Sequence, residues 1–149
     1  MKRFILLFVF CLITIVGKAQ LVPYRLAEAC SDNQGEVTFR LYIFCDSKKQ
    51  IDHASQLAAI RCVLFEGIPG TKFNKALINE GEATTVSNHQ AYFNDLYEWR
   101  YADYIQDFSM LSKFKRSGVG KSTLYEVTVK AIELRKDLEN NNIKTRFGI

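Results

Sequence analysis

Two stretches of the chain alternate regularly between hydrophobic and polar residues. In residues 36–45, EVTFRLYIFC, the apolar side consists of Val37, Phe39, Leu41, Ile43 and Cys45. In residues 122–131, STLYEVTVKA, it consists of Tyr125, Val127, Val129 and Ala131. A period of two predicts a strand with one buried face. The segment from Tyr101 to Lys115 also takes this period towards its end, with Phe108, Met110, Ser112 and Phe114 on one side, so it is predicted as a further strand.

Other segments follow helical spacing. Residues 51–66 carry an apolar stripe of Ile51, Ala54, Ala58, Cys62 and Phe65, joined by Leu57 and Leu64. Such a stripe predicts an amphipathic helix, which Gly67 can cap and Pro69 prevents from continuing. Ser87 or Asn88 is predicted to cap a helix that runs to Glu98. A last helix is predicted from Ile132, where Leu134 and Leu138 stand four residues apart.

The order strand–helix–helix–strand–strand–helix predicts an α+β fold. We expect a small antiparallel sheet of about three strands, with the helices packed on one face. Residues 20–35 are predicted to be an irregular lead-in that ends in a turn at SDNQG, and residues 36–149 a single domain. Residues 73–86 are predicted to form a loop with a short helical turn at Asn74–Ile78.

The first 19 residues have the three parts of a secretory signal peptide. Lys2 and Arg3 form a positive start, and Phe4–Val16 is an apolar run of 13 residues. Gly17 and Ala19 then stand before a predicted cut at Gln20. The competing interpretation is a membrane anchor, but the run is shorter than the roughly 20 residues that span a bilayer. We therefore expect no transmembrane helix in the mature chain.

Removal of this leader lowers the net charge from +4 to +1, because Lys2, Arg3 and Lys18 leave with it. A nearly neutral chain without a long basic tract does not suit nucleic acid or an anionic membrane surface. The predicted location is the periplasm or cell envelope, or the medium if the protein is secreted. A protein of the envelope is the partner that this location favours.

The stretch SGVGKST, Ser117–Thr123, matches the end of a nucleotide-binding P-loop. The leading glycine of that motif would be residue 115, which is lysine here. A P-loop also needs a helix after its lysine, so that the helix N-terminus faces the phosphates, whereas a strand pattern follows Lys121. We therefore predict a hairpin turn and no nucleotide.

Three cysteines remain after the leader: Cys30, Cys45 and Cys62. One disulfide with a free thiol, and three buried thiols, are both compatible with their spacing, which matches neither a redox motif nor a zinc site. Cys62 could form a nucleophile pair with His89, but its place on an apolar stripe favours an inert thiol. We assign no catalytic residue, no metal ligand and no cofactor.

The most unusual feature is aromatic. Residues 92–104, YFNDLYEWRYADY, hold six aromatic side chains, which a junction between a helix and a strand cannot all bury on one side. Tyrosine, tryptophan and arginine are enriched at binding hot spots. The alternative is that these side chains pack in the core and at its rim. The predicted interaction surface consists of Tyr97, Trp99, Arg100, Tyr101 and Tyr104.

The signal peptide, AIRCVLFEGIPG, AYFNDLY…YADYI and YEVTVKAIELRKDLENNNI together resemble a family of small exported proteins of Gram-negative anaerobes. The arrangement is also distantly similar to α+β modules of curli- and flagellum-associated accessory proteins. The likeness covers residues 36–143 and implies residence in the periplasm or envelope, with no known active site.

Three functions remain open at this point. The first is a non-enzymatic accessory or protein-interaction module of the envelope. The second is a small periplasmic enzyme that uses a cysteine or a carboxylate. The third is binding of a small ligand or glycan at the aromatic segment.

Overall fold

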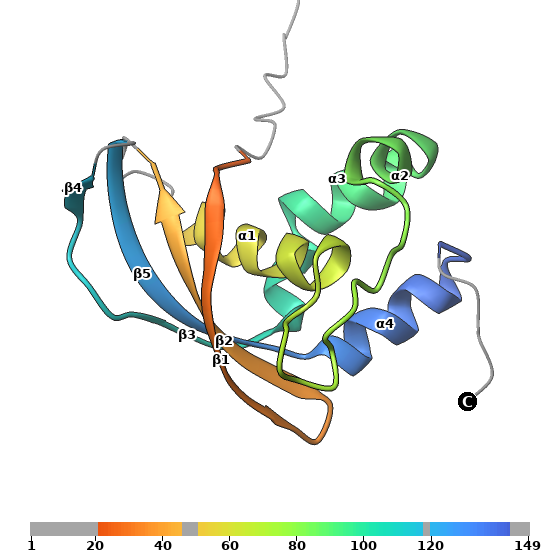
Figure 1. The fold of residues 1–149 in the computed structure, drawn as a ribbon. Helices are drawn as coiled ribbons and strands as arrows, with labels where there is room; N and C mark the ends of the chain where they lie inside the picture. Colours follow the sequence, from red (N-terminus) through yellow and green to blue (C-terminus); the bar gives the residue numbers. More distant parts are fainter. Residues whose placement is uncertain (1–20, 46–50, 118–119, 144–149) are drawn as a thin grey trace, which may run out of the picture.

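A computed structural model of the chain describes residues 21–45, 51–117 and 120–143. The predicted signal peptide lies outside the described residues. The described part is an α+β fold with four helices and a five-stranded antiparallel sheet. The sheet is curved, and Figure 1 shows all four helices on the same side of it. The α+β class is therefore confirmed, but the sheet has more strands than the predicted three.

The centre of the sheet is formed by the two strands that alternate most regularly. They are β2 (Glu36–Phe44) and β5 (Gly120–Val129), which pair along their length from Val37 opposite Val129 to Phe44 opposite Ser122. Their inward side chains are almost fully buried: Val37, Phe39, Leu41 and Ile43 from β2, and Thr123, Tyr125, Val127 and Val129 from β5. Alternation thus predicted both the strands and the face that packs against the helices.

The predicted irregular lead-in is wrong, because β1 (Tyr24–Asn33) pairs antiparallel with β2 at one edge of the sheet. The turn between these strands does fall where it was predicted, at Gln34 and Gly35, both with positive φ. The register of β1 shifts twice, between Leu26 and Glu28 and between Ala29 and Ser31. Each shift moves the buried positions by one residue, so the strand has no simple alternation.

The other edge of the sheet is built from the segment predicted as one strand from Tyr101. It divides into a 3₁₀ helix η1 (Arg100–Tyr104), β3 (Ile105–Met110) and, after a short connection, β4 (Lys115–Ser117). Both strands pair antiparallel with β5. A register shift between Ile105 and Asp107 breaks the expected period.

The predicted hairpin at SGVGKST is confirmed. Ser117 pairs with Gly120, whose φ of +120° favours glycine, and Lys121 and Ser122 continue as part of β5. Residues 118 and 119 lie outside the described part of the chain. Lys121 therefore lies within a strand and not at the helix N-terminus that a P-loop requires.

Helix α1 (Ile51–Phe65) lies across the concave face of the sheet (Figure 1). Ten of its 15 residues are buried, on more sides than the predicted stripe, because the sheet covers one side and other segments cover the rest. The helix ends at Phe65, and Gly67, with φ +80°, follows its end as predicted. A Cβ at this position would come within 2.6 Å of the Lys75 carbonyl carbon, so the close approach of the following loop requires glycine.

The remaining helices are α2 (Glu82–Asn88), α3 (Gln90–Glu98) and α4 (Ala131–Asn140). The short helix α2 was predicted as loop, and residues 74–78 do not form the predicted helical turn. His89, and not Ser87 or Asn88, occupies the N-cap of α3, without a side-chain hydrogen bond. Helix α4 was predicted to begin one residue later, and Leu134 and Leu138 are fully buried.

Candidate functional site

Helix α3 and the 3₁₀ helix η1 position the five residues of the predicted interaction surface. The inner face of α3 buries Phe93, Leu96 and Tyr97. The Phe93 ring meets the Tyr92 and Tyr97 rings edge-on, with centroids 5.2 and 5.5 Å apart. The Phe93 ring also lies 6.1 Å from the Phe65 ring at the end of α1, and this contact joins α3 to the rest of the domain.

Tyr97 is only 7% exposed and belongs to a polar cluster that joins α1 to α2 and α3. Arg61 donates two hydrogen bonds to the Glu82 carboxylate, at 2.6 Å from Nε and 2.8 Å from the terminal nitrogen. The Tyr97 hydroxyl donates to the same carboxylate at 3.2 Å. The Arg61 guanidinium also lies over the Tyr24 ring, 5.4 Å from its centroid. Burial, and next the charge of Glu82, raise the pKa of Tyr97, so this tyrosine stays neutral and acts as a donor.

Arg100 and Tyr104 belong to a second polar cluster, which joins α3 and η1 to α4. Arg100 lies 2.7 Å from Asp137 Oδ1 and donates to the Tyr104 hydroxyl at 2.8 Å. The Tyr92 hydroxyl donates to Asp137 Oδ2 at 2.6 Å. Burial alone would raise the pKa of Asp137, but hydrogen bonds, led by those from Tyr92 and Arg100, outweigh it and lower that pKa. Both oxygens of the Asp137 carboxylate are thus occupied by structural contacts.

Tyr101 and Trp99 differ from these buried tyrosines. The Tyr101 ring is half-buried and stacks on His53 of α1, with centroids 4.5 Å apart. Trp99 is 73% exposed and lies at the junction between α3 and η1. Of the predicted surface, the structure therefore leaves Trp99 open, keeps Tyr101 and Arg100 half-buried, and buries Tyr97 and Tyr104.

The residues considered for catalysis do not form a reactive cluster. Cys62 is fully buried, and burial raises the pKa of its thiol to about 12, which leaves almost no thiolate at neutral pH. His53 has its Nε2 atom 3.3 Å from the Tyr97 carbonyl oxygen and its ring against Tyr101. Cys30 is exposed and Cys45 is half-buried. Within residues 21–45, 51–117 and 120–143, no group of three or more His, Cys, Asp or Glu residues could hold a metal ion.

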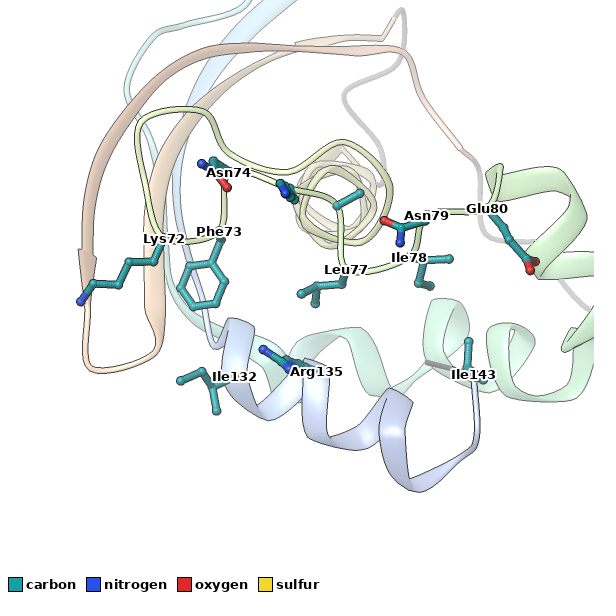
Figure 2. A pocket seen from close by; sticks show the side chains of 12 residues that line it. Lys72, Phe73, Asn74, Leu77, Ile78, Asn79, Glu80, Ile132, Arg135 and Ile143 are labelled. Atoms are coloured by element: carbon teal, nitrogen blue, oxygen red, sulfur yellow. The ribbon is translucent and has the colours of Figure 1, made fainter. Parts of the chain in front are cut away.

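A second feature, which the sequence did not predict, is an open groove between the loop 72–80 and α4 (Figure 2). Its volume is about 590 Å³. In Figure 2 the Phe73 and Ile132 side chains approach each other at one end, and Ile143 lies at the other. The residues that line it are Lys72, Phe73, Asn74, Lys75, Ala76, Leu77, Ile78, Asn79, Glu80, Ile132, Arg135 and Ile143. The mixture of cations and apolar residues in KFNKALIN was the one sequence signal for it.

Comparison with known proteins adds no family to these observations. No protein-family model, no curated protein and no solved structure matches the chain. The resemblance to exported envelope proteins stays a prediction. No helix in the described part of the chain is long and apolar enough to cross a membrane.

Proposed function

We propose that the protein is an exported, non-enzymatic interaction module of the cell envelope, with Trp99 as its anchor residue. The observation that carries this proposal is the 73% exposure of the only tryptophan in the chain. A large aromatic side chain left open to solvent loses a favourable burial energy, and tryptophan is the residue type most enriched at binding hot spots.

The surroundings of Trp99 support this role because they hold its backbone in place. The Arg61–Glu82–Tyr97 cluster fixes α3 on one side of it, and the Arg100–Asp137 pair fixes η1 on the other. The backbone N–H of Trp99 donates to the Asp95 carbonyl oxygen at 3.0 Å. A side chain presented from a rigid backbone loses less conformational entropy when a partner covers it.

The predicted signal peptide supports a partner in the periplasm or envelope. The buried Cys62 thiol, with its raised pKa, does not suit the alternative of a cysteine nucleophile. The groove between the loop 72–80 and α4 is a second surface feature of the kind that a binding module uses.

Site-specific photo-cross-linking in the cell tests this proposal. The photoreactive residue p-benzoylphenylalanine is placed at position 99 and, as the control, at position 111, where Leu111 is also exposed. We expect a discrete adduct with an envelope protein from position 99 and none of the same mass from position 111. Equal adducts from both positions, or none from position 99, would contradict the assignment of Trp99.

A further inference from the structure

The groove between the loop 72–80 and α4 combines an apolar floor with a positive rim. Phe73, Ile132 and Ile143 offer apolar surface to it, and Ile132 is 41% exposed. Lys72 and Lys75 lie on the loop side, and both are exposed. Figure 2 shows the loop along one side of the groove and α4 along the other.

The charges of the lining are not balanced. Arg135 pairs with Glu139 of its own helix at 2.9 Å. Among the described residues, neither Lys72 nor Lys75 has a carboxylate within ion-pair distance of its ammonium group. Glu80, at the other end of the loop, is the one acidic residue of the lining. The Asp32 carboxylate, which accepts the Lys72 N–H, leaves this end with two lysines against one acid, so it is complementary to a ligand with carboxylates.

The polar residues of the lining favour an acidic peptide over a fatty carboxylate as the anionic ligand. Asn74 lies at the lysine end of the loop and Asn79 near Ile78 and Glu80 at the other end, so the lining has an amide towards each end (Figure 2). An alkyl chain laid along the groove would remove their amides from water without offering a hydrogen bond, which is unfavourable. A peptide backbone carries both donors and acceptors that can pair with these amides.

The dimensions of the groove also suit a peptide. The helical part of the α4 wall runs from Ile132 to Asn140, eight residues on, so helical rise gives it a length of roughly 12 Å. An extended chain rises about 3.3 Å per residue, so about four residues fill this length.

The loop that forms one wall is held in place before any ligand binds. The Leu77 and Ile78 N–H groups donate to the Val63 and Leu64 carbonyl oxygens at the end of α1, at 3.3 and 2.8 Å. The Lys72 N–H donates to the Asp32 carboxylate of β1. A wall that is already ordered reduces the entropy that binding must offset.

We infer that this groove binds an extended acidic segment of a partner protein, with one of its apolar side chains packed between Phe73 and Ile132. The inference rests on the proposed function, because the ligand is a protein, and deepens it by naming the chemistry that the partner presents. Its residues are different from Trp99, so the two assignments can fail separately.

Selection from a phage-displayed library of random eight-residue peptides tests this inference. The target is the protein in the form that remains after its host cell has processed it. Selected peptides should combine Asp or Glu with at least one large apolar residue. Their affinity for K72E/K75E should fall about tenfold or more, because two favourable charges become repulsive. The charge-matched control, K113E/K115E, changes two exposed lysines near β4 and should bind as the wild type does.

A second pair of variants tests the apolar contact. Ile132→Ser should weaken the selected peptides, whereas Leu111→Ser, at another exposed apolar residue, should not. Circular dichroism of all variants verifies that each has kept its fold. If the library yields no acidic peptides, or peptides that bind K72E/K75E undiminished, the inference is overturned.

Two further outcomes would assign the groove to a different ligand. Binding of dodecanoate without binding of peptides would make it a site for fatty carboxylates. A concentration-dependent dimer that K72E/K75E dissociates would make it a contact between copies of this chain. If no acidic peptide binds but position 99 still gives its adduct, only the assignment of the groove is overturned. If acidic peptides bind but position 99 gives no adduct, only the assignment of Trp99 is overturned.

Discussion

Helix α1 and the segment from Tyr97 to Tyr104 use their side chains in opposite ways. Helix α1 is buried on most of its surface, and its two possible nucleophiles, Cys62 and Ser55, are enclosed by the core. The aromatic segment buries Tyr97 and Tyr104 against polar partners and turns Trp99 out to solvent. The comparison shows that burial and exposure are separated along the chain: α1 supplies the core, and the aromatic segment leaves Trp99 open, which is where our proposal places the partner.

The largest effect is expected in the reactivity of the buried Cys62 thiol of α1 compared with the exposed Cys30 thiol. Iodoacetamide at pH 8 should modify the exposed Cys30 of the native protein, whereas Cys62 should react on the order of a thousandfold more slowly than in the unfolded chain, because it is reached only through unfolding. Mass spectrometry of peptides from a time course measures both rates. Fast labelling of Cys62 in the folded protein would show that α1 is not enclosed. It would also favour the alternative of an enzyme with a cysteine nucleophile.

The next largest effect concerns the cluster that joins α1 to the aromatic segment. Glu82→Ala should lower the free energy of unfolding by about 3 kcal/mol, because it leaves the Arg61 charge half-buried without its partner. Glu80→Ala, at an exposed glutamate two residues earlier, is the control and should stay within about 0.5 kcal/mol of the wild type. Urea unfolding measures both values. Similar values for the two variants would mean that the cluster does not hold α3 in place.

The second cluster should make stability depend on pH on the acid side. The pKa of Asp137 is lowered in the folded state from its usual 3.8, so its contribution is present above about pH 4 and is lost as the pH falls through the folded value. Asp137→Asn should cost about 2 kcal/mol at pH 7, where charged hydrogen bonds are lost, and less at pH 3. Urea unfolding at the two pH values measures this difference. A cost that does not change with pH would contradict the assigned role of the Asp137 charge.

The smallest effect on stability is expected at Trp99 itself. Trp99→Ala should change the free energy of unfolding by no more than about 0.5 kcal/mol, because the side chain is already in water. Tyr104→Ala, five residues later, should cost about 3 kcal/mol, because that ring is buried. Thermal and urea unfolding of the two variants make the comparison. If Trp99→Ala is as destabilising as Tyr104→Ala, the tryptophan is a packing residue and not an anchor.

Most of the regular structure was predictable, because its signals are local. Alternation predicted β2 and β5, and helical spacing together with Gly67 predicted α1. β1 was missed because two register shifts remove its alternation. The short helix α2 has no side-chain cap that would have marked its beginning.

The candidate site was predictable only in its location. Composition drew attention to residues 92–104, but burial of individual side chains depends on contacts that are distant in sequence. Tyr92 meets Asp137 across 45 residues, and Arg61 meets Glu82 across 21. The groove was not predicted because its two walls, the loop 72–80 and α4, are brought together only by the fold.

The fluorescence of the only tryptophan shows whether Trp99 is open in the free protein and covered by a partner. Emission spectra and acrylamide quenching are recorded for the free protein, and then after addition of the purified partner identified by cross-linking from position 99. We expect red-shifted, readily quenched emission from the free protein, and a blue shift with protection from acrylamide in the complex. Blue, protected emission from the free protein, or a spectrum that the partner leaves unchanged, would contradict the assignment of Trp99.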